Sequence, residues 1–190
     1  MLTRSLSAAL VLACLGLAAP AASAQQVIHA LTGTVSHLDP AGKTISVLVD
    51  GASQADFADA TMSSASVSMD KKVRALIAAG SDGHKAGAYV IVFFYGGNDA
   101  RTAVGLRSLG TGPFSSTVGT VVKFEGHLHS LTVTDEAGQT QTFKVDENTV
   151  TEGGFGVVDG SKFQARKGDR VRIVASGPAG DLAALFIRGA

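Results

Sequence analysis

The stretch GTVSHLDPAGKTISV, residues 33–47, returns 86 positions later as GTVVKFEGHLHSLTV, residues 119–133. Both stretches open on Gly-Thr-Val, and their later apolar residues stay in phase. Phe57 aligns with Phe143 at the same shift. A match of this length with the apolar positions in register indicates an internal duplication.

The alignment continues at a shift of 81, which places Gly87 on Gly168 and Arg107 on Arg188. The two shifts predict one length difference of five residues between Phe57 and Gly87. We interpret the copies as residues 28–110 and 114–190, within domains 25–112 and 113–190. A period this long predicts that each copy has its own core, unlike the units of a solenoid.

Apolar residues alternate with polar ones in short runs such as HSLTVTD, QTFKVD and DRVRIVAS, which is the pattern of β-strands. About five such strands per copy, with Gly-rich turns, predict an all-β protein of two duplicated small β-barrels. The oligonucleotide/oligosaccharide-binding (OB)-like barrel is the preferred form, and a small open sandwich is the alternative. One short helix is expected near residues 70–79, capped by Asp70.

The first-copy strand AYVIVFFY is apolar on both faces. Its outward positions are Tyr89, Ile91, Phe93 and Tyr95, which makes them candidate interface residues. We expect intramolecular cover, from the second copy or from the helical segment at residues 70–79, with a ligand pocket or a partner protein as alternatives. The equivalent outward positions in the second copy are Arg170 and Arg172, which belong to a basic cluster that we expect at a solvated sheet edge.

The chain begins with a basic start, an apolar stretch and the small-residue site Ala22-Ser23-Ala24, which predict a signal peptide over residues 1–24. Cys14, the only cysteine, suggests lipidation as a weaker alternative, because apolar residues continue beyond it. We therefore expect a periplasmic or secreted protein with no transmembrane span. The 16 basic and 16 acidic residues balance, and this gives no reason to expect nucleic acid as a partner.

His127 and His129 are the best candidate metal ligands, because residues i and i+2 of a strand share one face. A zinc site uses three or four ligands, and the sequence offers no third ligand at a recognisable spacing. We find no nucleophile, acid pair or phosphate-binding loop in a catalytic context, so no cofactor and no enzymatic activity are expected.

The scheme of GTV, FKVD, TV and KGDRVRI in the second copy rests on Gly119, Val133, Phe143, Asp146, Thr149, Gly168, Asp169 and Ile173. It resembles exported bacterial β-domains of unknown function that often occur in tandem. The first copy departs from it, with Ala88 in place of the acidic residue. The resemblance implies fold and export, and it supplies no functional residues.

Three functional hypotheses follow. The first is an exported, non-enzymatic module that binds an unknown ligand or associates with the cell envelope. The second is a metal-binding protein or metal-dependent enzyme that uses His127 and His129. The third is a structural subunit that assembles through the apolar strand 89–95.

Overall fold

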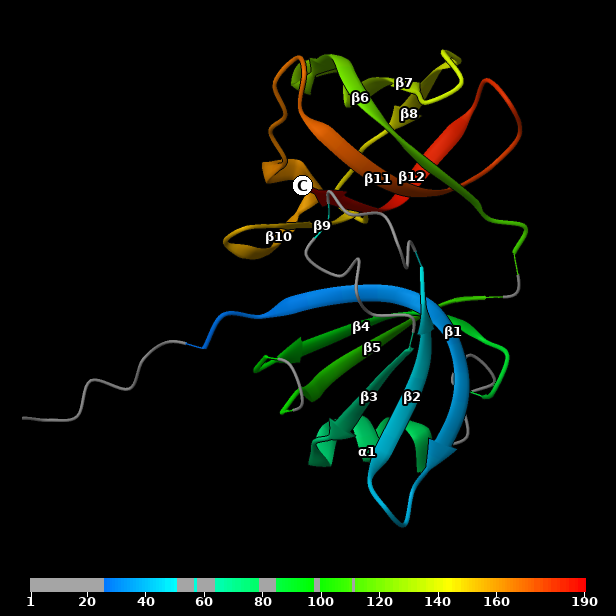
Figure 1. Cartoon of the computed structure of the whole chain (residues 1–190), viewed down its shortest axis with the longest axis vertical. Helices are drawn as coiled ribbons and strands as arrows, with labels where there is room; N and C mark the ends of the chain where they lie inside the picture. The colour runs from blue at the N-terminus through cyan, green and yellow to red at the C-terminus, as the bar shows by residue number, and fades with distance from the viewer. Residues whose placement is uncertain (1–25, 51–56, 58–63, 79–84, 98–99, 111) are drawn as a thin grey trace, which may run out of the picture.

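A computed structural model describes residues 26–50, 57, 64–78, 85–97, 100–110 and 112–190 (Figure 1). The predicted signal peptide, residues 1–24, lies outside them. The all-β class is confirmed, since strands β1 to β12 make up most of this part and α1 is its one α-helix. No helix in these ranges is long and apolar enough to cross a membrane.

The first unit is a closed barrel with strand order β1-β2-β3-β5-β4. Its elements are β1 (His29–Asp39), β2 (Thr44–Val49), β3 (Ser64–Met69), α1 (Lys71–Ala78), β4 (Tyr89–Tyr95) and β5 (Thr102–Gly110). Antiparallel pairing joins all neighbours except β3 and β5, which run parallel. Closure leaves few exposed strand edges, as the sequence predicts.

The second unit is a seven-stranded sheet with order β10-β9-β12-β11-β6-β7-β8, and an added β12–β8 pairing closes five of these strands into a ring. Its elements are β6 (Ser115–Glu125), the 3-10 turn η2 (Gly126–Leu128), β7 (Ser130–Asp135), β8 (Thr140–Lys144), β9 (Val150–Gly153), β10 (Gly156–Asp159), the 3-10 turn η3 (Gly160–Lys162), β11 (Arg170–Ser176) and β12 (Leu182–Gly189). The ring β6-β7-β8-β12-β11 repeats the strand order of the first barrel.

The duplication extends to backbone irregularities. The β-bulge after Val35 recurs after Val121, at the shift of 86. Gly33 and Gly119 also share one role: a Cβ on Gly33 would lie 2.0 Å from the Leu48 carbonyl oxygen, and one on Gly119 would lie 2.4 Å from that of Thr134. Only glycine fits where the first strand of each barrel lies so close to its paired neighbour.

The alignment of Phe57 with Phe143 is wrong. Phe143 pairs with Leu131, and the corresponding pair in the first unit is Val67 with Ile45, so Val67 is the counterpart of Phe143. The shift therefore falls from 86 to 76 (143 minus 67) before it becomes 81. The two copies differ in length twice: the first is ten residues longer before β3, and the second is five longer where hairpin β9–β10 stands in place of α1.

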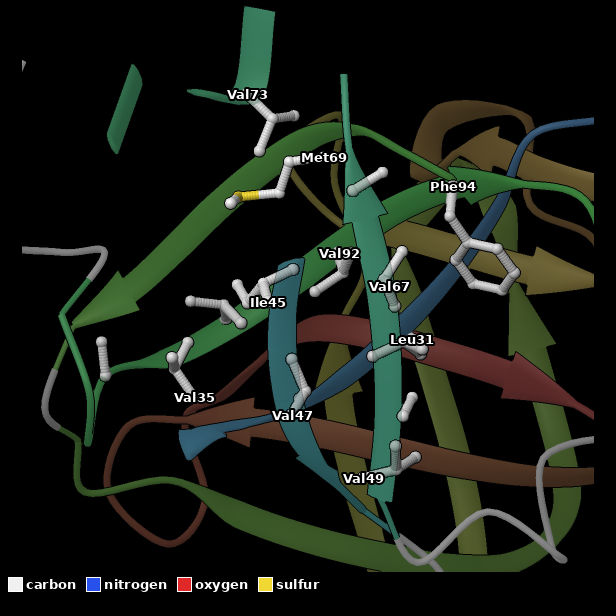
Figure 2. Close-up of a cluster of buried hydrophobic side chains, with 14 residues drawn as sticks. Leu31, Val35, Ile45, Val47, Val49, Val67, Met69, Val73, Val92 and Phe94 are labelled. Carbon is white, nitrogen blue, oxygen red and sulfur yellow. The ribbon is translucent and has the colours of Figure 1, made fainter. Parts of the chain in front are cut away.

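Each barrel encloses its own apolar cluster. In the first unit, side chains from all five strands meet inside the barrel, and Val73 of α1 faces the same cluster (Figure 2). The predicted helix is confirmed: Asp70 caps it by accepting a hydrogen bond from the Val73 N–H at 2.7 Å. In the second unit, Leu131, Phe143 and Ile173 occupy the equivalent centre.

Candidate binding site at the junction of the two units

A third apolar cluster joins the units. Ala30 and Ile91 of the first unit pack with Val150, Val174 and Phe186 of the second, and all five are buried. Tyr89 and Phe93 lie against the same cluster, while Tyr95 is half-buried at the end of β4. The second copy thus packs on the outward face of β4 at Tyr89, Ile91 and Phe93, and assembly with a partner protein through this strand stays a prediction.

Hydrogen bonds between the two units lie at the edge of this cluster. The buried Glu152 carboxylate accepts hydrogen bonds from the Ala30 N–H at 3.0 Å and pairs with His29 Nδ1 at 2.8 Å, while Arg188 donates to the Ala30 carbonyl. Glu152 and Arg188 are neighbours on β9 and β12. Burial raises the pKa of Glu152, and His29 and Arg188 partly oppose that rise.

Arg172 departs from the expected solvated edge. Its side chain is fully buried, with the guanidinium 5.2 Å from the centre of the Phe57 ring. Nearby, the Tyr89 hydroxyl donates to Asp50, and burial followed by this bond raises the pKa of Tyr89 far above its ordinary value. Arg170 keeps the expected surface role, paired with Glu136.

Two adjoining hollows lie where the linker between the units meets the β11–β12 loop. One has a volume of about 780 Å³ and the other about 710 Å³, and Pro113, Phe114 and Gly177 line both. We call the two hollows together the junction groove. Its position follows from Phe114, whose ring stacks on Tyr89 of the first unit at a centroid distance of 4.9 Å.

The larger hollow contains no ionisable side chain in its wall. Phe114 and Leu182 supply apolar surface, and Ser115, Gln139, Gln141 and Thr142 supply hydroxyl and amide groups. The smaller hollow adds one charged residue, Arg107, whose guanidinium donates to the Asn148 carbonyl. This chemistry suits an uncharged ligand that combines apolar and hydrogen-bonding groups.

The structure places His127 and His129 outside any strand. His127 lies in η2, and His129 follows it with a left-handed backbone at φ 52°, the conformation of its first-unit counterpart Lys43. Both side chains are exposed. Because neither residue lies in a strand, the premise that they share one strand face is wrong. Within the described ranges, no group of three or more His, Cys, Asp or Glu side chains could hold a metal ion.

Sequence reasoning missed Phe114 and the Gln139–Thr142 segment. An aromatic residue directly after Gly-Pro in the linker was the available signal, because linker residues between domains are usually polar. No sequence pattern near residues 139–142 predicts that they line a hollow, because this depends on where β12 stops pairing with β8.

Comparisons with known proteins yield limited likeness. No family model and no curated protein matches the chain. One similar solved structure is titled "Crystal structure of Ag(I)CusF". It has 14% sequence identity and a TM-score of 0.32, and the match covers 42% of this chain and 100% of that one. A likeness this weak carries no argument about function.

Proposed function

We propose that this protein is an exported, non-enzymatic binding module whose ligand lies in the junction groove. The single observation that carries the proposal is the pair of adjoining hollows around Phe114, built from both units and lined almost entirely by uncharged groups. The volume of each hollow falls in the range typical of ligand sites.

The distribution of ionisable groups supports binding over catalysis. Acid–base or nucleophilic chemistry needs titratable groups that face the substrate. The groups with strongly altered environments, Glu152 and Tyr89, are not among the residues that line the groove. Glu152 binds across the units to His29 and Ala30, and the Tyr89 hydroxyl donates to Asp50 within the first unit.

Amide chemical-shift mapping tests the proposal on ¹⁵N-labelled residues 25–190. The probes are maltohexaose, the capped tripeptide acetyl-Val-Thr-Val-amide and Zn²⁺. We expect one of the two organic probes to shift the amide signals of Phe114, Thr140 and Gly177, and Phe114→Ala to remove that response. Phe155→Ala is the matched control, because Phe155 is an exposed ring on the β9–β10 turn away from the groove.

Signals that shift only near His127 and His129 on adding Zn²⁺ would instead support the metal-binding hypothesis. Metal analysis of protein purified without an affinity tag gives an independent measure of that alternative. Export is tested separately, since the mature protein from its native host should begin near Gln25 by mass spectrometry.

A further inference from the structure

We infer that the ligand of the junction groove is an uncharged, extended peptide that adds as a strand to the open edge of β8. This inference rests on the proposed function and names the ligand class of the same site. The β8 strand is fully paired on its β7 side and only partly paired on its β12 side.

Along its full length β8 pairs with β7, but it pairs with β12 only at Phe143 and Lys144. The Asp135 N–H donates to the Gln139 carbonyl at 2.9 Å, and the Val145 N–H donates to the His129 carbonyl at 2.8 Å. These bonds show that the odd-numbered residues of this stretch direct their backbone groups to β7.

Successive residues of a strand direct their N–H and C=O groups to opposite edges. The backbone of Thr140 and the N–H of Thr142 therefore point away from β7. In the part of the chain that the structure describes, no strand pairs with β8 at these two residues. Both residues line the larger hollow of the groove.

An extended peptide matches this edge better than a glycan does. The Thr140 and Thr142 N–H groups repeat every two residues, about 6.8 Å apart, which is the backbone repeat of an added strand. The facing wall, from Ala175 to Leu182, leaves a volume of about 780 Å³ for the added segment. Since no ionisable side chain lines the hollow, and the nearby Asp181 carboxylate is paired with Lys144, uncharged residues are favoured, with apolar ones able to contact Phe114 and Leu182.

The test uses a displayed library of random nine-residue peptides, selected on residues 25–190 and followed by synthesis of the enriched peptide. Thr140→Pro removes the N–H that faces the groove and leaves the β7 ladder intact, since proline is tolerated at a strand edge. Thr140→Val is the matched control, because both variants lose the Thr140 hydroxyl bond to Thr134 but only the proline loses the donor.

We expect the selected peptide to bind the wild-type protein and Thr140→Val equally, and Thr140→Pro about tenfold more weakly, as the loss of one hydrogen bond predicts. N-methylation along the peptide should reduce affinity at alternate residues only. Equal binding to the proline and valine variants, or loss of affinity without alternation, would overturn strand addition.

Three other outcomes separate the inference from the proposed function. If no peptide is enriched but maltohexaose shifts the groove signals, strand addition is wrong and the groove remains the binding site. If the peptide binds but Phe114→Ala has no effect and the shifts lie elsewhere, the proposed site is wrong. If no probe shifts the groove signals, both are wrong.

Discussion

Glu152 is a buried carboxylate that connects the two units through Ala30 and His29. Because burial raises its pKa in the folded protein above the unfolded value near 4.5, folding favours its protonated form. Its contribution to stability is therefore complete below pH 4.5 and is lost as the pH rises through the raised pKa. We expect Glu152→Gln to lack this loss, so that urea unfolding from pH 4 to 7 shows wild type losing stability relative to the variant. Parallel curves for the two proteins would contradict the assignment.

Arg172 is buried by the neighbouring unit and lies over Phe57. We expect Arg172→Ala to lower the free energy of unfolding by about 2–4 kcal/mol, because it leaves a cavity at the junction. Arg172→Met, which keeps an unbranched apolar stem, should lose less stability than Arg172→Ala, since it fills most of the cavity, but it should not match wild type, because it removes one buried charge from its surroundings. Denaturant unfolding measures both, with the exposed Arg166→Ala as the control. Equal losses for the alanine and methionine variants would show that the charge itself is required.

In each barrel, one glycine allows the first strand to lie close to its paired neighbour. Gly33→Ala and Gly119→Ala would each drive a methyl group into a backbone carbonyl of the neighbouring strand. We expect each variant to lose about 2 kcal/mol or more of unfolding free energy, because backbone cannot move aside as a side chain can. Gly153→Ala is the control, since a Cβ there meets nothing within 4 Å. If thermal denaturation shows Gly33→Ala or Gly119→Ala to be as stable as wild type, this account of the duplication is contradicted.

For the strands and helices, the sequence predicts most of the fold, but it predicts little of the candidate binding site. The strands follow from period-two patterns that each copy repeats, and α1 follows from its cap, whereas the bulges and the role of Gly33 and Gly119 appear only in the strand pairing. The Phe57 alignment failed because one shared residue type outweighed a strand pairing that only the structure reveals. Arg172 was misplaced because its burial depends on the other unit. The open edge of β8 depends on where β12 stops pairing, which no local pattern contains.

The whole molecule is held together by the cluster that both units share, and this predicts cooperative unfolding. Ile91→Ala removes side-chain volume at the centre of that cluster, so we expect a loss of about 3 kcal/mol and faster amide hydrogen exchange in both units. Leu48→Ala, at a surface position of the first barrel, should change neither. Two separate unfolding transitions in the wild-type protein, or faster exchange confined to the first unit, would show that the barrels fold independently.

Coupled units would also keep the walls of the junction groove fixed, since Phe114 contacts Tyr89 in one unit and lines the hollow in the other. A ligand held there should therefore raise the unfolding temperature of the whole chain.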